Sequence, residues 1–356
     1  MRIIMLVDMD YFFVACEELR NKEIIGKPTV VGFDPKQGKG RGVVMTCNYE
    51  ARKYGIRSGM PISMAYRLKP DAIYLPLDYD WYEKVSKDVM SVIKEHAAKF
   101  EQVSVDEAFI DVSDKVSDFD DARIYARRLK DNIKNRIGLP CTIGVSYNKL
   151  LAKMACESAK PDGIGVVAES EAKAFLENKS TDDLYGVGRK TKERLEAMGF
   201  KTVGELAKAN PMDMMENFGA FGIELHDYAN GIDNSEVNEN YEIKSIGREH
   251  TFEKDTSSEK DAIEAIDRLS KEVIEEVKKN GFAFKVITLK IRYSDFSEHL
   301  RSRSIRYSND IKDVMTISAQ LYRDNVEKDR KVRKIGVRVS GFIKRKGQKS
   351  MEDFAR

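Results

Sequence analysis

Two runs of apolar residues along the chain each lead into carboxylates. Ile3–Val7 is a continuous apolar run, which predicts a buried strand, and it passes directly into Asp8. The stretch Val103–Ser113 is rich in apolar and β-branched residues, which predicts a strand and turn near a sheet, and it contains the adjacent pair Asp106 and Glu107. If the two strands are neighbours, these carboxylates converge.

Converging carboxylates suit hard cations. Like charges close together are unfavourable unless a cation or a base neutralises them. Taken alone, the pair Asp106-Glu107 is more often a solvated acidic turn. Asp8 changes this interpretation, because the end of a central strand is a poor place for a solvated charge. Three carboxylates can hold two Mg²⁺ ions, the arrangement used for in-line phosphoryl or nucleotidyl transfer.

A strand that turns into a helix follows at Val43–Gly55. This helix carries Tyr49 and Arg52, which are three residues apart and therefore share a face. A phenol beside a guanidinium suits a triphosphate, because Arg binds phosphate oxygens in a fork geometry. Taken alone, the pattern is that of an ordinary amphipathic helix.

Further predicted elements complete the first half of the chain. Apolar residues at helical spacing predict helices at Tyr82–Phe100, Asp120–Arg136 and Asn148–Ala159. Thr29–Phe33 and Cys141–Ser146 read as strands.

The composition bounds the class of protein. The chain has 356 residues, of which 42% are hydrophobic and 34% are charged, so it can form two or more domains with sizeable cores. No apolar run approaches the roughly 20 residues of a membrane-spanning helix, and no signal peptide is visible, so we expect a cytoplasmic, nucleoid-associated protein. The four cysteines lack paired spacing, which predicts reduced, mostly buried thiols: Cys16, Cys47, Cys141 and Cys156.

The charge is distributed unevenly. Residues 285–349 contain 18 Lys and Arg but 7 Asp and Glu, whereas the whole chain has a net charge of +2. Alternating strands and two amphipathic helices in this region predict a sheet with one apolar face under the helices and one basic face. Such a face fits DNA through phosphate contacts. The candidate contacts are Arg248, Lys290, Arg292, Arg301, Arg303 and Arg338.

A glycine-punctuated turn, Leu184–Thr191, leads into a predicted helix at Lys192–Met198. It has the Gly-apolar-Gly spacing of a helix-hairpin-helix, in which backbone amides and a helix N-terminus face a DNA phosphate. Its candidate contacts are Gly186, Gly188, Arg189 and Lys190. A tight turn between two helices is the alternative.

Several motifs in order resemble those of a Y-family DNA polymerase, of the DinB or DNA polymerase IV branch. They are Asp8 with Phe12-Phe13, Asn48–Lys53, Ser104–Ala108 and Ala159-Lys160-Pro161, and the likeness runs almost the whole length. The resemblance implies an α+β multidomain fold shaped as a right hand. Its parts are a ferredoxin-like palm (1–10 and 78–167), small fingers (11–77), a helical thumb (168–232), a linker (233–244), a βαββαβ-like little finger (245–341) and a tail (342–356).

The resemblance also implies a chemistry. A primer 3′-OH attacks the α-phosphate of a deoxynucleoside triphosphate at two Mg²⁺ ions, for which Mn²⁺ is a possible substitute, without proofreading. Asp8, Asp106, Glu107 and the Met9 carbonyl are the implied metal ligands, the first three being catalytic. The implied nucleotide-binding residues are Tyr49, Arg52, Lys160 and the amides near Phe12 and Phe13; without the family, Lys160 reads as a charge at a helix C-terminus. Phe13 is the implied steric gate against ribose, and Val43 and Met45 the implied roof over the nascent base pair.

Two other functions stay open at this stage. A palm-fold nucleotide cyclase also uses paired carboxylates, and a DNA-bound scaffold without catalysis needs none of them. The implied partners of a polymerase are primer-template DNA, deoxynucleoside triphosphates and a sliding clamp, with the enzyme itself a monomer.

The C-terminal residues carry the clamp prediction. Gln348, Met351 and Phe354 are spaced by three, so in a 3₁₀ turn they share one face, as in clamp-binding peptides. Ala355 departs from that pattern, where a second aromatic is usual, which predicts weaker binding. A frayed terminus with chance spacing is the alternative.

Overall fold

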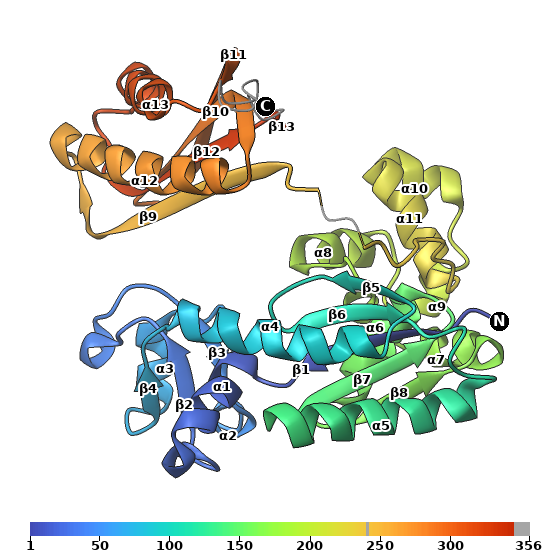
Figure 1. The fold of residues 1–356 in the computed structure, drawn as a ribbon. Helices are drawn as coiled ribbons and strands as arrows, with labels where there is room; N and C mark the ends of the chain where they lie inside the picture. The colour runs from blue at the N-terminus through green and yellow to red at the C-terminus, as the bar shows by residue number, and fades with distance from the viewer. Residues whose placement is uncertain (240–241, 345–356) are drawn as a thin grey trace, which may run out of the picture. The chain divides into compact units, whose positions relative to one another are not determined.

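The computed structural model describes residues 1–239 and 242–344. The chain divides into two compact units with their boundary between residues 241 and 242, and Figure 1 shows both. Among the described residues, no helix is both long and apolar enough to cross a membrane.

A five-stranded sheet forms the centre of the first unit, in the order β5-β6-β1-β7-β8. The strands are β1 (Ile4–Met9), β5 (Lys99–Gln102), β6 (Glu107–Asp111), β7 (Cys141–Ser146) and β8 (Ile164–Val167). Every residue of β1 is buried. Because this strand is covered on both faces, its sequence is continuously apolar rather than alternating.

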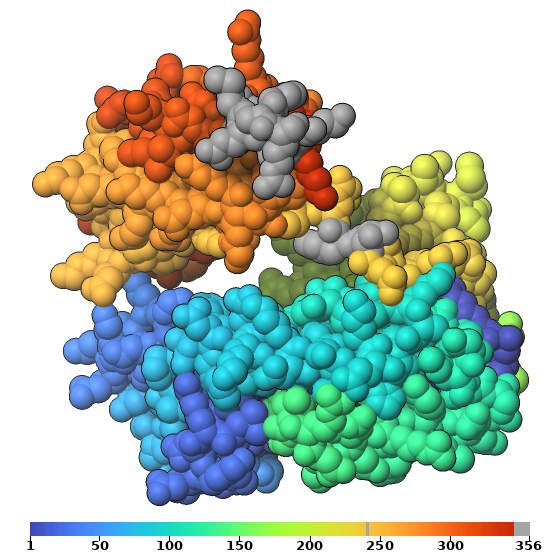
Figure 2. Space-filling model, in the orientation of Figure 1, coloured from blue at the N-terminus to red at the C-terminus, as the bar shows by residue number. Residues whose placement is uncertain are grey.

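Helices cover both faces of this sheet. Helices α4 (Tyr79–Glu95) and α5 (Phe119–Ile137) share a core with Met5, Val7 and Met9 of β1, and their side chains form a continuous surface (Figure 2). Helix α6 (Lys149–Ala159) lies on the opposite face, where Ala152 and Cys156 pack against Ile4 and Leu6.

Two glycines let α6 approach this sheet closely. Gly144 on β7 and Gly165 on β8 are paired in register. A Cβ at Gly144 would lie 1.9 Å from the Ala152 carbonyl oxygen, and one at Gly165 would lie 2.2 Å from that of Ala155. Any larger residue would therefore push α6, and the lysines it carries, away from the strands.

A three-stranded sheet, β3-β2-β4, stands beside the first one. It consists of β2 (Thr29–Gly32), β3 (Val44–Cys47) and β4 (Ile73–Leu75), with α1 (Phe12–Arg20), α2 (Tyr49–Arg52) and α3 (Ile62–Leu68) nearby. The Asn48 side chain accepts a hydrogen bond from the Ala51 amide, which caps α2, and another from the Thr29 amide. It therefore fixes where Tyr49 begins the helix.

Short helices make up residues 172–229. They are α7 (Ala172–Glu177), α8 (Arg189–Ala197), α9 (Val203–Leu206), α10 (Pro211–Phe218) and α11 (Ala220–Ala229). Leu195, Met214 and Leu225 are fully buried in their common core.

The segment 232–239 has no helix or strand, in keeping with the predicted linker, but it is fastened to the first unit. The Asp233 carboxylate accepts a hydrogen bond from the Leu150 amide at 3.0 Å. Val237 is buried against Ile4 and Phe109.

The second unit has the predicted βαββαβ order. Its elements are β9 (Ser245–Thr256), α12 (Glu259–Lys279), β10 (Phe282–Tyr293), β11 (Glu298–Ser308), α13 (Ile311–Asn325) and β12 (Val332–Ser340), followed by a short β13 (Ile343–Lys344). The sheet order is β11-β10-β12-β9, and all neighbours are antiparallel. Both helices contribute to the core on one face, where Ile287, Leu289 and Ile291 are buried.

Two local predictions are wrong. The helix predicted to reach Phe100 ends at Glu95, and Lys99 already begins β5. Helix α8 begins at Arg189 rather than Lys192, because the second glycine of the turn is itself the N-cap. The predicted strand and turn at Val103–Ser113 are present, with Val103 and Val105, 47% and 41% exposed, in the turn before β6. The prediction for the cysteines is confirmed, since all four are buried and free.

Candidate active site

Asp8 and Glu107 lie directly opposite each other in the antiparallel pair formed by β1 and β6. The Asp106 carbonyl accepts a hydrogen bond from the Met9 amide at 2.9 Å. The predicted adjacency of the two acidic stretches is therefore present in the backbone, at the end of two central strands.

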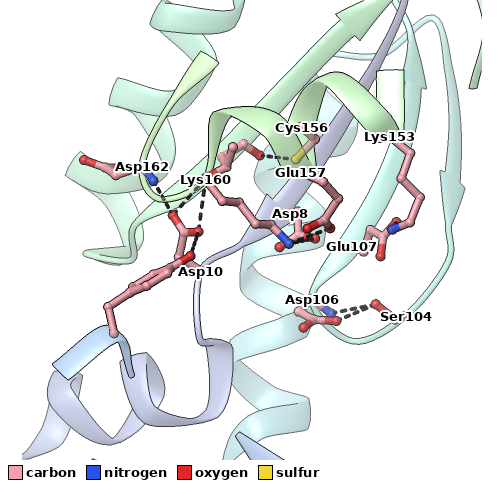
Figure 3. Close-up of polar contacts among 12 residues, drawn as sticks. Asp8, Asp10, Ser104, Asp106, Glu107, Lys153, Cys156, Glu157, Lys160 and Asp162 are labelled. Carbon is pink, nitrogen blue, oxygen red and sulfur yellow. Dashed lines mark hydrogen bonds and ion pairs between the residues drawn. The ribbon is translucent and has the colours of Figure 1, made fainter. Parts of the chain in front are cut away.

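Each of these carboxylates has a polar partner of its own (Figure 3). Lys160 donates to Asp8 at 2.8 Å, and Lys153 of α6 donates to Glu107 at 2.6 Å. The Ser104 hydroxyl donates to Asp106 at 2.5 Å. The described residues contain no group of three or more ligating side chains gathered to hold a metal ion.

The electrostatics of the site favour a cation. Burial raises the pKa of Asp8 to about 7, Lys160 opposes this rise, and the charge of Glu107 adds to it. A buried carboxylate that resists ionisation gains most when a divalent ion neutralises it. The donor set is made of carboxylate and carbonyl oxygens, which are the ligands that hard cations prefer, so these residues fit Mg²⁺.

Tyr49 and Arg52 lie together, as their spacing predicts. The Arg52 guanidinium stands over the Tyr49 ring at 4.5 Å, and Arg52 Nε donates to the Cys47 carbonyl at 3.2 Å. Burial, followed by the nearby charge of Asp10, raises the pKa of Tyr49 to about 12. The phenol therefore stays protonated, and its one O–H is donated to the Asp10 carboxylate.

Sequence reasoning missed two residues of this site. The sequence analysis gives Lys153 no role, although it lies seven residues, about two turns, before Lys160. Asp10 received no role, yet it is 1% exposed and accepts a hydrogen bond from the Tyr49 hydroxyl. The available signal was a second carboxylate in Asp8-Met9-Asp10, at the end of a strand too buried for a solvated charge.

The two phenylalanines after Asp10 have different surroundings. Phe12 is 2% exposed and belongs to the core, so only its amide, in the first turn of α1, is suited to a ligand. Phe13 is half-buried and stacks on Tyr82, with ring centroids 4.5 Å apart. The Tyr82 hydroxyl donates to Glu17 at 2.7 Å, which fixes the ring behind Phe13.

Val43 and Met45 share a face at the start of β3. Val44 between them is 1% exposed, whereas Val43 is 36% exposed and Met45 is half-buried. Both side chains are thus more accessible than that of Val44, which belongs to the core.

The glycine-rich turn before α8 leaves backbone amides uncovered. Gly186 has φ of +89°, a conformation that favours glycine. A Cβ at Gly188, the N-cap of α8, would meet no atom within 4 Å. Arg189 and Lys190 follow as exposed residues of the first turn, so the site has open amides beside positive charge.

The basic surface of the second unit is divided between two faces, which corrects the prediction of a single basic face. Lys290 and Arg292 on β10, with Arg338 and Lys334 in register on β12, lie on the face opposite the helices. Arg301 and Arg303 pair with Leu289 and Ile287, so they lie on the helix side. There they donate to Asn325 and Gln320 of α13. Arg248 pairs with Val337 and is on the helix side as well.

Carboxylates interrupt the open face. Glu249 accepts from Lys290 at 2.9 Å and from Lys334 at 2.8 Å. Glu298 pairs with Arg292 at 2.5 Å and with Lys290 at 3.2 Å. Of the four cations named on this face, Lys290, Arg292 and Lys334 are thus already paired with carboxylates. The predicted clamp-binding residues Gln348, Met351 and Phe354 lie outside the described residues.

Profiles of known families match most of the chain. A profile described as the impB/mucB/samB family matches residues 7–157, and its C-terminal-domain counterpart matches 243–352. A profile described as the thumb domain of DNA polymerase-iota matches residues 182–233.

Individual relatives cover nearly the full length. The chain is 40% identical over 340 residues to DNA polymerase IV of Methanoculleus marisnigri, covering 95% of this chain and 94% of that protein. A solved Y-family DNA polymerase chimera superposes with a TM-score of 0.86 at 32% identity, covering 96% of this chain and 99% of that one. The insertion ternary complex of Dbh DNA polymerase superposes with a TM-score of 0.67 at 32% identity, covering 96% of this chain and 99% of that one.

The chain therefore belongs to the Y-family DNA polymerases, in the DNA polymerase IV branch. It is a low-fidelity, translesion DNA-directed DNA polymerase, and such enzymes are metal-dependent nucleotidyltransferases. This confirms the resemblance carried by the motifs and favours the polymerase over the cyclase and the inactive scaffold.

Proposed function

We propose that this polymerase extends a primer 3′-OH at a centre formed by Asp8, Asp106 and Glu107. The observation that carries the proposal is the opposition of Asp8 and Glu107 across β1 and β6, with Asp106 bonded to Met9 beside them. These carboxylates and the Met9 carbonyl would hold two Mg²⁺ ions. When bound, such ions activate the attacking hydroxyl and stabilise the leaving pyrophosphate.

The residues around this centre would bind and orient the nucleotide. Tyr49, Arg52 and Lys160 present one phenol and two cations to the triphosphate, and the first-turn amides of α1 add backbone donors. Lys160, which donates to Asp8 here, would donate to a phosphate oxygen in the nucleotide complex. Phe13 closes the sugar side, while Val43 and Met45 lie on the exposed face of β3 for the base pair.

Primer-template DNA would be held through phosphate contacts at two surfaces. At the first surface, DNA phosphates would bind the amides of Gly186 and Gly188 together with Arg189 and Lys190. At the second surface, the open face of the second unit, DNA phosphates would bind Lys290, Arg292 and Arg338. Arg248, Arg301 and Arg303 would reach DNA at the rims of the sheet. Contacts of this kind are neutral to sequence, as a general polymerase requires.

Primer extension across an abasic site, with all four deoxynucleotides and Mg²⁺, tests this function. Extension that stops when EDTA is added supports it. Incubation with ATP alone tests the cyclase alternative: a cyclic product without any primer extension would replace the proposal.

We also propose that the chain is a monomer tethered to a sliding clamp through Gln348, Met351 and Phe354. A short segment that becomes ordered on a groove is an economical tether. Truncation before Gln348 is expected to leave distributive extension unchanged and to remove clamp binding, measured by calorimetry with the cognate clamp. Equal clamp affinities of the intact and truncated chains would exclude the tail as the tether.

A further inference from the structure

Asp10 lies two residues after Asp8, and it contacts both Tyr49 and the loop that follows Lys160 (Figure 3). It follows β1 directly, and its side chain is buried, at 1% exposure. A buried carboxylate close to a triphosphate repels the ligand through its charge. Its presence therefore indicates a role that offsets this repulsion.

Several donors fix this carboxylate at both oxygens. The Tyr49 hydroxyl donates to Oδ1 at 3.2 Å, and the Asp162 amide donates to Oδ2 at 2.9 Å. The Thr142 hydroxyl of β7, itself fully buried, lies 3.1 Å from each oxygen. Thr142 therefore orients the carboxylate so that one oxygen faces Tyr49 and the other faces the loop.

Both outer partners of Asp10 belong to the phosphate-binding side of the site. Tyr49 carries the stacked Arg52 guanidinium. Asp162 is two residues beyond Lys160, and Lys130 holds the same residue from the other side, at 2.5 Å from its carboxylate. One buried side chain thus connects the start of α2 with the loop that follows α6.

We propose that Asp10 is a positioning residue that sets the separation of Tyr49 and Lys160 for the triphosphate. The inference rests on the proposed function, since it assigns these two residues to the nucleotide. Asp10 touches no reacting atom; it acts through the Tyr49 hydroxyl and the Asp162 amide.

A positioning role and a purely electrostatic role of Asp10 predict opposite effects of its substitution on the KM for nucleotide. If Asp10 acted only as a charge, its removal would lower the KM for nucleotide. If it positions, Asp10→Ala raises this KM on the order of ten-fold or more, because two charge-assisted hydrogen bonds are lost. Asp10→Asn retains an acceptor for the Asp162 amide and offers its NH₂ to the Tyr49 oxygen, so its KM stays much nearer to the parental value.

Single-nucleotide insertion by the full chain, with kcat and KM separated and thermal unfolding recorded, tests the proposal. The expected result is a raised KM in Asp10→Ala that exceeds the change in kcat, with near-complete rescue in Asp10→Asn. Thr142→Val is the second variant and decides the matter if Asp10→Ala does not fold: without its orienting hydroxyl, KM is expected to rise although Thr142 touches neither Tyr49 nor Lys160.

Specific outcomes overturn the inference. The first is a nucleotide KM of Asp10→Ala that is equal to or lower than the parental value. If Asp10→Ala does not fold, the second is a nucleotide KM of Thr142→Val that is equal to the parental value. Both leave the proposed function intact as long as the parental chain extends primers. Failure of the parental chain itself would instead refute the proposed function.

Discussion

The ring of Phe13 stacks on the ring of Tyr82, with centroids 4.5 Å apart and planes inclined by 20°. Tyr82 is 1% exposed and its hydroxyl is bonded to Glu17, so it cannot retreat. As the proposed steric gate, Phe13 would exclude a 2′-OH by clash rather than by a missing contact.

Phe13→Ala is therefore expected to admit ribonucleotides while DNA synthesis persists, and Tyr82→Leu to admit them to a smaller extent by removing the support. The ratio of ribonucleotide to deoxynucleotide insertion measures both effects. If Phe13 is merely a core residue, the variant loses thermal stability and its sugar preference stays the same.

The ion pair between Lys153 and Glu107, at 2.6 Å, competes with any metal at that carboxylate. Lys153→Ala is expected to tighten Mn²⁺ binding several-fold in the absence of DNA, because the ion no longer has to displace an ammonium group. Lys149→Ala is the matched control, since it removes a similar pair with Glu101, at 2.8 Å, from the same helix. Titration followed by Mn²⁺ paramagnetic resonance measures both affinities, and equal tightening in the two variants would contradict the assignment.

Met45 has an unbranched side chain on the exposed face of β3, which can narrow the space above a base pair. Met45→Ala is expected to improve insertion opposite a bulky or cross-linked template base relative to an undamaged one. Steady-state insertion on the two templates gives this ratio. A ratio that is unchanged or lower counts against placing Met45 over the base pair.

Glu249 and Glu298 occupy cations that DNA phosphates would otherwise contact. Glu249→Gln and Glu298→Gln are each expected to tighten DNA binding. Each is also expected to steepen the salt dependence of the binding constant by the amount that about one additional phosphate contact produces. Glu264→Gln, at an exposed position of α12, is the control. Affinity measured by anisotropy at several salt concentrations checks this; salt slopes equal to the parental one would mean that DNA does not use this face.

Local patterns were sufficient for most elements of the fold. The run Ile3–Val7 and the predicted helices Asp120–Arg136 and Asn148–Ala159 each matched an element within two residues, because burial and capping act over short distances. The helix predicted to continue to Phe100 failed because its last residues pair with β6, and a tertiary contact of this kind overrides helical spacing.

The site was predictable where residue type determined chemistry and not where partners did. Asp8 near the end of β1 and Glu107 at the start of β6 follow from the apolar runs that adjoin them. Lys153 meets Glu107 only when α6 packs on the sheet, which depends on the closeness allowed by Gly144. Asp10 meets its donors only when α2, β7 and the loop after α6 come together. The face occupied by Arg301 depended on strand register, because a shift of one residue moves a side chain to the other face.

Primer extension by Asp106→Ala tests the central claim most directly. Asp131→Ala, at an exposed position of α5, is the matched control, and DNA binding of both variants is measured in parallel. Loss of one metal-site carboxylate is expected to slow extension at least about a hundred-fold, with DNA affinity close to the parental value. Asp131→Ala is expected to extend like the parent. Extension by Asp106→Ala at a rate near that of Asp131→Ala would contradict the assignment of the catalytic centre.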